Sequence, residues 1–276
     1  MIKAAVIGDP ISHSLSPKIH GYFLRKYNID GSYEAIRVEK NNLKEDVLKL
    51  INEGYAGFNV TLPHKEEIFK LCYFRSKSAE MCGAVNTVII TEDKKLFGHN
   101  SDVDGFLNNL KISVPDFDLK GKNAFVIGAG GAARAVVYGL LKSGVKKVFI
   151  TNRNFERAEK LITDFAKMGS VEFLAHDDFC KKLDVCDLLV NSTSLGMKGQ
   201  EPLKINLENL QKSAIVYDIV YKPLITELLA SSQKRGNKIV TGIGMLTGQA
   251  LIGFEAWFKT KPEADVELEK ILTQNL

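Results

Sequence analysis

The chain has 276 residues, 45% of them hydrophobic and 25% charged, a composition that excludes disordered and collagen-like proteins and allows one large or two medium domains. The formal net charge is only +4, and Lys and Arg are spread along the chain, which argues against a nucleic-acid partner bound through a basic stripe. No apolar run approaches the ~18–20 residues that span a bilayer, so no membrane partner is expected.

The N-terminal part of the chain alternates short apolar runs with segments whose apolar residues recur at helical spacing. This alternation is typical of a largely parallel α/β fold. The predicted strands span residues 4–8, 33–38, 57–60 and 85–90, the last closed by a turn at Glu92 and Asp93, and the predicted helices span 17–27 and 42–52.

A second alternating block begins near Gly121 and carries six short strand candidates. They span residues 124–127, 147–151, 171–174, 188–191, 214–219 and 238–240, with helical patterns such as 132–143 and 157–166 between them. Six strands in a βαβ series have the size of a complete dinucleotide-binding sheet. The sequence therefore predicts a Rossmann-type domain in this block.

The expected domain organisation has two lobes. The polar stretch 100–104 is the predicted first crossing between the blocks, and the chain ends in two predicted helices, 245–258 and 263–272. We expect these helices to pack back on the N-terminal block, with the active cleft between the lobes. The predicted domains are residues 1–102 with 243–276, and residues 103–242.

A glycine-rich turn follows the first strand of the second block. Residues 128–133 satisfy the pattern G-x-G-x-x-A, in which Gly128 permits a tight turn and Gly130 lets the backbone approach a pyrophosphate. The following helix offers free N–H groups to phosphate. A plain strand–turn–helix is the alternative, but the position at the start of a six-strand series favours a nucleotide site.

The end of the next strand indicates which nucleotide binds. NAD enzymes usually carry Asp or Glu there, which accepts a hydrogen bond from the ribose 2′-hydroxyl. This chain has Asn152, Arg153 and Asn154 instead, with Arg157 one helical turn later. Arginines can clamp a 2′-phosphate with charge-assisted hydrogen bonds, which favours NADP. The alternative is that both arginines are solvated residues at a helix start.

Polar clusters in the N-terminal block are poorly explained by structure alone. Ser14 and Ser16 lie between the first strand and the first helix, where hydroxyls and free backbone donors could bind a carboxylate. Ser16 could instead be only an N-cap, with Pro17 at the first helical position. Further polar residues lie at strand ends or before helices: Asn59, Thr61, Lys65, Asn86 and Asp102.

Eight segments, in this order, resemble those of shikimate dehydrogenases: NVTLPHK, GAVNT, GHNSDVDG, GAGGAARA, TNRN, NSTSLGM, YDIVYKPLITELL and GIGMLTGQA. With the Ser14 region, the resemblance runs from Ser12 to Gln249. It implies an NADP-dependent oxidoreductase that reversibly reduces 3-dehydroshikimate to shikimate in chorismate and aromatic amino-acid biosynthesis. Two departures are mild: Ser101 stands where Thr is commoner, and Asn154 where many NADP-using members have Thr.

The resemblance also implies roles for individual residues. Ser14 and Ser16 would hold the substrate carboxylate, and the ring hydroxyls would be held by Asn59, Thr61, Asn86, Asp102 and Gln249, with Tyr221 and Lys65 nearby. The nucleotide would be held by Gly128, Ala129, Gly130, Gly131, Ala132, Asn152, Arg153, Asn154, Arg157, Ile219 and Gly242.

Reduction of a ring ketone leaves a developing alkoxide that must be stabilised and protonated. We hypothesise that Lys65 is the acid, and the base in the reverse direction, with Asp102 orienting it. Taken alone, Lys65 would be a solvated surface charge and Asp102 an N-cap. His64 is the competing acid–base residue. No metal is needed, and the histidines show no ligand spacing.

Two other functions compete with this one. The same chemistry with quinate and NAD is the nearer, and a non-catalytic nucleotide-sensing Rossmann protein is the other. The four cysteines form no CxxC pair or metal-ligand spacing, which favours reduced thiols and a cytoplasmic location. The expected partner is a small molecule, and the resemblance leaves room for a homodimer.

Overall fold

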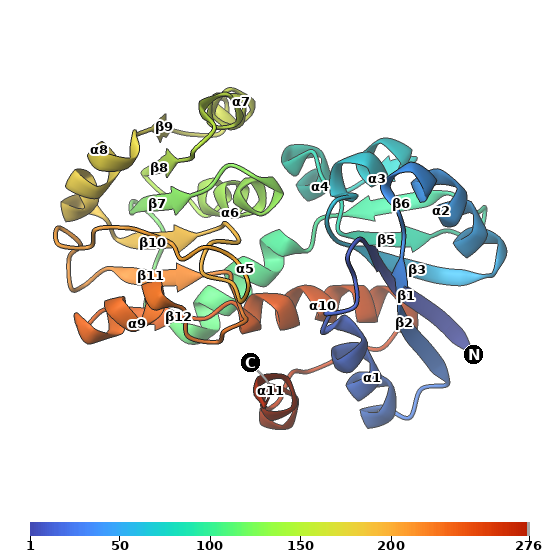
Figure 1. Ribbon diagram of the computed structural model, residues 1–276. Helices are drawn as coiled ribbons and strands as arrows, with labels where there is room; N and C mark the ends of the chain where they lie inside the picture. Colours follow the sequence, from blue (N-terminus) through green and yellow to red (C-terminus); the bar gives the residue numbers. More distant parts are fainter. Residues whose placement is uncertain (275–276) are drawn as a thin grey trace. The chain divides into compact units, whose positions relative to one another are not determined.

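The computed structural model describes residues 1–274 and divides the chain into two compact units (Figure 1). The first unit comprises Met1–Asp102 and the C-terminal part from Thr247 on, and the second comprises Val103–Leu246. Residues 275 and 276, which end the first predicted domain, lie outside the described residues.

The first unit is built on a mixed six-stranded sheet in the order β2-β1-β3-β5-β6-β4. Strand β1 pairs in parallel with β2 and β3, whereas β5 pairs antiparallel with both β3 and β6. The strands are β1 (Ile2–Gly8), β2 (Gly31–Arg37), β3 (Tyr55–Val60), β4 (Phe74–Arg75), β5 (Thr87–Ile90) and β6 (Leu96–His99). The helices before β6 are α1 (Ser16–Lys26), α2 (Leu43–Asn52), α3 (Lys65–Leu71) and α4 (Lys77–Cys82).

The C-terminal helices α10 (Ile243–Phe258) and α11 (Val266–Thr273) supply part of the first unit's core, as predicted. The Trp257 indole donates a hydrogen bond to the Val88 carbonyl oxygen of β5 at 2.9 Å, and the Phe254 ring packs 5.3 Å from that of Phe23 on α1. The Tyr22 hydroxyl donates to Asp265 at 2.7 Å and links α1 to the start of α11. The hydrophobic core of the first unit is therefore formed by residues from both the N-terminal and the C-terminal parts of the sequence.

The second unit is a fully parallel sheet in the order β12-β11-β10-β7-β8-β9. This is the order of a doubly wound dinucleotide-binding sheet, which confirms the predicted Rossmann-type fold. The strands are β7 (Asn123–Ile127), β8 (Lys147–Thr151), β9 (Val171–Phe173), β10 (Leu188–Asn191), β11 (Ile215–Asp218) and β12 (Lys238–Val240). The helices are α5 (Asp102–Ser113), α6 (Gly131–Lys142), α7 (Phe155–Phe165), α8 (His176–Lys181) and α9 (Glu227–Lys234).

Several elements differ from the prediction. Helices α3 and α4 and strands β4 and β6 were not predicted, and the predicted strand 85–90 begins only at Thr87. Helix α7 begins at Phe155, two residues before the predicted start, because the Asn154 side chain accepts from the Arg157 amide and caps it. The alternative role of Ser16 as an N-cap is wrong: Ser16 is the first helical residue, and Leu15 occupies the cap position.

Candidate active site

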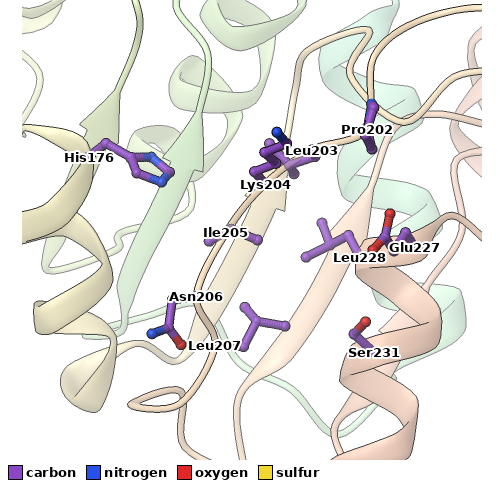
Figure 2. A pocket seen from close by; sticks show the side chains of 10 residues that line it. All are labelled: His176, Pro202, Leu203, Lys204, Ile205, Asn206, Leu207, Glu227, Leu228 and Ser231. Atoms are coloured by element: carbon purple, nitrogen blue, oxygen red, sulfur yellow. The ribbon is translucent and has the colours of Figure 1, made fainter.

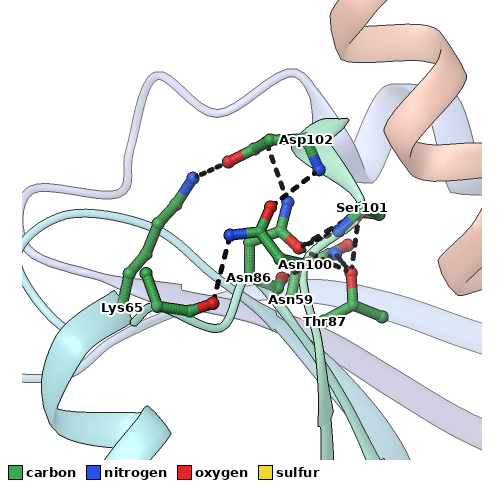
Figure 3. A network of polar contacts seen from close by, with 8 residues as sticks. Asn59, Lys65, Asn86, Thr87, Asn100, Ser101 and Asp102 are labelled. Carbon is green, nitrogen blue, oxygen red and sulfur yellow. Dashed lines mark hydrogen bonds and ion pairs between the residues drawn. The ribbon is translucent and has the colours of Figure 1, made fainter. Parts of the chain in front are cut away.

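Lys65 and Asp102 form a close ion pair within the first unit (Figure 3). Lys65 Nζ lies 2.6 Å from Asp102 Oδ2, and the two side chains are 21% and 12% exposed. Each residue is the first of its helix, Lys65 of α3 and Asp102 of α5. The Asp102 amide donates to Asn100 Oδ1 at 3.2 Å, while the Asp102 carboxylate accepts from Lys65 and from Asn86. Its contacts are therefore not those of a simple N-cap.

Asn86 holds the other side of that carboxylate. Its Nδ2 donates to Asp102 Oδ1 at 2.8 Å, and its Oδ1 accepts from the backbone amide and hydroxyl of Ser101 at 2.8 and 3.1 Å. Asn86 and Ser101 are buried. Ser101, which stands where Thr is commoner, keeps a hydroxyl, and this hydroxyl donates to Asn86. Both oxygens of Asp102 thus accept hydrogen bonds from defined donors.

His64 is the neighbour of Lys65 but occupies a different environment. Its side chain is fully buried, and its Nε2 donates to the Val38 carbonyl oxygen at 2.7 Å. Val38 belongs to the apolar core of the first unit. The imidazole is therefore part of the buried core, whereas the Lys65 side chain contacts Asp102.

Ser14, Ser16 and Thr61 lie at the carboxyl ends of neighbouring parallel strands. Ser14 lies in the loop after β1, Ser16 begins α1, and Thr61 directly follows β3. The two strands are paired up to Ile7 and Val60. Ser14 Oγ accepts from the Ser16 amide at 3.3 Å. Such ends are where ligands bind in open α/β sheets. Asn59 lies at the end of β3 too, but its amide is already held by protein groups.

The glycine turn lies where β7 passes into α6. Gly128 has φ +113°, and a Cβ on it would lie 2.7 Å from Ser192 Oγ, so only glycine fits there. A Cβ on Gly130 or Gly131 would meet no atom within 4 Å. Gly130 is the N-cap of α6, and no side chain caps that helix. Open space over uncapped backbone N–H groups fits the pyrophosphate of a dinucleotide.

Arg153 and Arg157 follow β8 in the neighbouring turn and at the start of α7. Both are exposed, and neither has an acidic partner among residues 1–274. Asn152 donates to the Asn154 backbone oxygen at 2.7 Å, and this contact shapes the turn that carries them. Strand β8 pairs with β7, the strand that precedes the glycine turn. Two guanidinium groups at this position could bind an anionic group such as a 2′-phosphate.

A buried carboxylate, Asp218, organises two loops at the end of the nucleotide sheet, and it was not predicted. Its Oδ1 accepts from Asn191 at 2.9 Å and from the Val220 amide at 3.0 Å, and its Oδ2 accepts from Thr226 at 2.7 Å. Burial raises the pKa of Asp218 to about 6, against the opposite effect of these hydrogen bonds. The motifs that contain Asn191 and Asp218 were visible in the sequence, but their contact was not.

Ile219, Tyr221 and Gly242 depend on the same loops. A Cβ on Gly242 would lie 2.2 Å from the Ile219 carbonyl oxygen, so the chain after β12 passes against the chain after β11. Burial raises the pKa of Tyr221 and keeps its phenol neutral. Gln249 is buried on α10 and belongs to the first unit.

A separate pocket of about 460 Å³ lies in the second unit between the loop 202–207 and α9 (Figure 2). It is lined by apolar residues and by His176, Lys204, Asn206, Glu227 and Ser231. None of the predicted site residues lines it. In residues 1–274 no group of three or more His, Cys, Asp or Glu residues could hold a metal ion. No helix in that same range is both long and apolar enough to cross a membrane.

Comparison with known proteins places these features in a family. Residues 6–88 match the shikimate dehydrogenase substrate binding domain, and residues 110–222 match the shikimate / quinate 5-dehydrogenase family. The chain is 44% identical over 265 residues to the shikimate dehydrogenase (NADP(+)) of Paramagnetospirillum magneticum, covering 96% of this chain and 95% of the relative.

Solved structures are similar over the whole length. Shikimate 5-dehydrogenase from Thermus thermophilus in complex with NADP(H) and shikimate has a TM-score of 0.89 and 34% identity, covering 100% of both chains. Shikimate 5-dehydrogenase from Listeria monocytogenes in complex with shikimate and NAD has a TM-score of 0.91 and 32% identity, covering 99% of this chain and 96% of that one. The sequence motifs, the two units and these full-length similarities agree, and the chain belongs to the shikimate dehydrogenase family.

Proposed function

We propose that this chain is an NADP-dependent shikimate dehydrogenase, which reversibly reduces 3-dehydroshikimate to shikimate in the biosynthesis of chorismate and the aromatic amino acids. The observation that carries the proposal is the Lys65–Asp102 pair, held at 2.6 Å within a buried network of hydrogen bonds. The curated relatives carry the same activity in their names.

Lys65 is the proton donor in this proposal. As the ketone is reduced, negative charge develops on its oxygen, and an ammonium group stabilises and then protonates that oxygen. In the reverse direction the Lys65 amine accepts the proton from the hydroxyl. Asp102 orients Lys65 and accepts a hydrogen bond from the adjacent ring hydroxyl. His64 is the weaker candidate because its imidazole is fully buried and bonded to Val38.

The remaining substrate contacts follow from the polar strand ends. Ser14 and Ser16 bind the carboxylate, and ring hydroxyls are held by Thr61, Asn86, Gln249 and Tyr221, with Asn59 supporting them from beneath. NADPH, when bound, supplies the hydride. The turn from Gly128 to Ala132 holds its pyrophosphate, Asn152 to Arg157 hold the 2′-phosphate, and Ile219 and Gly242 line the rest of its site.

The test compares Lys65→Met with Lys70→Met. Lys70 lies on the same helix, is 66% exposed and, within residues 1–274, pairs only with Glu67, so it controls for the loss of one charge on α3. General acid–base catalysis contributes about 10²–10⁴-fold, so kcat should fall by that factor in Lys65→Met alone. Near-normal turnover in Lys65→Met, or a comparable loss in His64→Ala alone, would overturn the assignment.

The nearest alternative keeps the chemistry with quinate and NAD. The Listeria structure holds NAD, so this fold accepts either cofactor. Two exposed arginines without acidic partners in the described chain support NADP here. Steady-state rates with NADPH and NADH, each with 3-dehydroshikimate and 3-dehydroquinate, decide between the two. Binding of NADPH without oxidation by either acid would favour a nucleotide sensor instead.

We also propose a cytoplasmic location and a homodimer. The exposed, edge-to-face pair Tyr73 and Phe74 lies at edge strand β4, and an exposed apolar edge of this kind supports association of two copies. Cell fractionation tests the location, and light scattering of the purified protein tests the dimer. A monomer at micromolar concentration would contradict the second statement.

A further inference from the structure

A directional chain of hydrogen bonds extends from Asp102 into the core of the first unit (Figure 3). Asn86 Oδ1 accepts from the Ser101 amide, the Ser101 hydroxyl and the Thr87 hydroxyl, the last at 3.2 Å. An amide oxygen filled by donors leaves the Asn86 amino group to face Asp102. The orientation of Asn86 therefore decides what Asp102 meets.

Asn59 supports this arrangement from the layer beneath. Its Nδ2 donates to the backbone carbonyl oxygen of Asn86 at 3.1 Å and to Thr87 Oγ1 at 3.2 Å. An amide nitrogen can only donate, so the Thr87 oxygen accepts this hydrogen bond, and the Thr87 hydroxyl proton points toward Asn86 or Ser101. Asn59 is 4% exposed and depends on protein groups for its orientation.

Tyr33 fixes that orientation. Its hydroxyl donates to Asn59 Oδ1 at 2.6 Å, a shorter bond than those of Thr87 with Asn59, Asn86 and Ser101. The Tyr33 ring is stacked on the His20 ring, with centroids 3.9 Å apart and planes 12° apart, and Trp257 lies at 5.9 Å. The Tyr33 hydroxyl, the first donor in this series of hydrogen bonds, is therefore held in place by ring packing.

The protonation states around Tyr33 keep it a donor. Burial raises the pKa of the Tyr33 phenol well above its usual value, with the neighbouring Ser16 side chain acting in the opposite direction. Burial lowers the pKa of His20 to about 3, so its ring stays neutral at working pH. Over the pH range of the enzyme the phenol keeps its proton and the amide of Asn59 keeps one orientation.

We propose that Tyr33 is a positioning residue for the reaction, acting through Asn59, Thr87 and Asn86 on the Asp102–Lys65 pair. This inference rests on the proposed function. Without the Tyr33 hydroxyl, Asn59 Oδ1 loses its donor, and the amide is held less firmly by the two bonds that its Nδ2 donates to the Asn86 backbone carbonyl oxygen and to Thr87. The Thr87 hydroxyl can then turn away from Asn86 Oδ1, and Asn86 loses one of the donors that hold its amino group against Asp102.

The experiment compares Tyr33→Phe with Tyr55→Phe. The Tyr55 hydroxyl lies in the same sheet and donates to Glu34, outside the network, so it controls for the loss of one tyrosine hydroxyl. One hydrogen bond to a neutral partner corresponds to a factor of about 2–12, and we expect kcat for 3-dehydroshikimate to fall about tenfold in Tyr33→Phe. The KM for NADPH should stay unchanged, and Tyr55→Phe should keep kcat within about twofold.

A double-mutant cycle separates positioning from plain destabilisation. If Tyr33 acts through Asn59, adding Tyr33→Phe to Asn59→Ala should cause little further loss of kcat. Additive losses, or an unchanged kcat in Tyr33→Phe, would overturn the inference. If Tyr33→Phe does not fold, Thr87→Val carries the test, because it removes the hydroxyl between Asn59 and Asn86 with little change of shape. Failure of the wild-type chain to reduce 3-dehydroshikimate would instead refute the proposed function.

Discussion

Replacement of Asp218 by Asn should change how the stability of the protein depends on pH. Asp218 is fully buried, and no ion pair in residues 1–274 involves it. Burial raises its pKa from 3.8 to about 6, so the folded chain binds this proton more tightly than the unfolded chain does. The stability that this proton contributes is complete below pH 3.8 and is lost as the pH rises through about 6.

The magnitude follows from the two pKa values. The interval between 3.8 and about 6 corresponds to about 3 kcal/mol of unfolding free energy. Asn does not titrate, and all other groups are common to the two proteins. The wild-type unfolding free energy minus that of Asp218→Asn should therefore fall by about 2.4 kcal/mol between about pH 4 and pH 7, which is most of the full difference.

Urea denaturation of both proteins at several pH values measures this difference. Asp116→Asn, at an exposed position of the same unit, controls for the removal of one charge. The Asn side chain also loses an acceptor for Thr226 or Asn191, which adds a cost at every pH and leaves the slope unaffected. A difference that is flat or rises with pH would refute the reasoning.

Three further predictions concern the two units. Gly130→Ala should leave the melting temperature unchanged, because its Cβ enters open space, but should weaken NADPH binding at least tenfold. Gly128→Ala should weaken binding and also lower the melting temperature. Calorimetry and a binding titration separate the two effects, and a wild-type NADPH affinity in Gly130→Ala would contradict the site. Arg157→Ala should raise the KM for NADPH at least tenfold, since a charge-assisted hydrogen bond is worth about 1.5–3 kcal/mol. The KM for NADH is its control, and equal changes with both cofactors would argue against a 2′-phosphate contact. His64→Ala should lower the unfolding free energy by about 2–3 kcal/mol through loss of the buried bond to Val38, and keep kcat within about threefold. Chemical denaturation and turnover numbers check this, and a stable but inactive variant would restore His64 as the acid.

The sheet of the second unit could be predicted because its four inner strands, β11, β10, β7 and β8, are short, nearly continuous apolar runs that are buried along almost their whole length. All four residues of β10 are buried, for example. Strand β4 has only two residues. The burial of β6 alternates, but its sequence ends in Gly98 and His99 and shows no alternation of apolar and polar residues. Helix α3 has one fully buried residue, Ile68, and is too short for a helical period to appear. These elements depend on tertiary pairing rather than on their own pattern.

The chemistry-bearing residues could be named because they lie in recognisable motifs, and family membership confirmed the resemblance. Their hydrogen-bond partners could not be named. Tyr33 meets Asn59 across 26 positions of sequence, and Asn191 meets Asp218 across 27. The alternative N-cap role of Ser16 was wrong by one position, because the helix begins at Ser16 and Leu15 occupies the cap position.

The bond from Trp257 to the Val88 carbonyl has a consequence for how the protein is made. The strands of the first unit are synthesised before the second unit, whereas the indole and the Phe254 ring that complete their core are synthesised after it. The second unit has its whole parallel sheet, from β7 to β12, before those residues emerge. Domains generally fold as units during synthesis. The second unit should therefore fold first. The strands of the first unit can complete their core only after helix α10 has been synthesised.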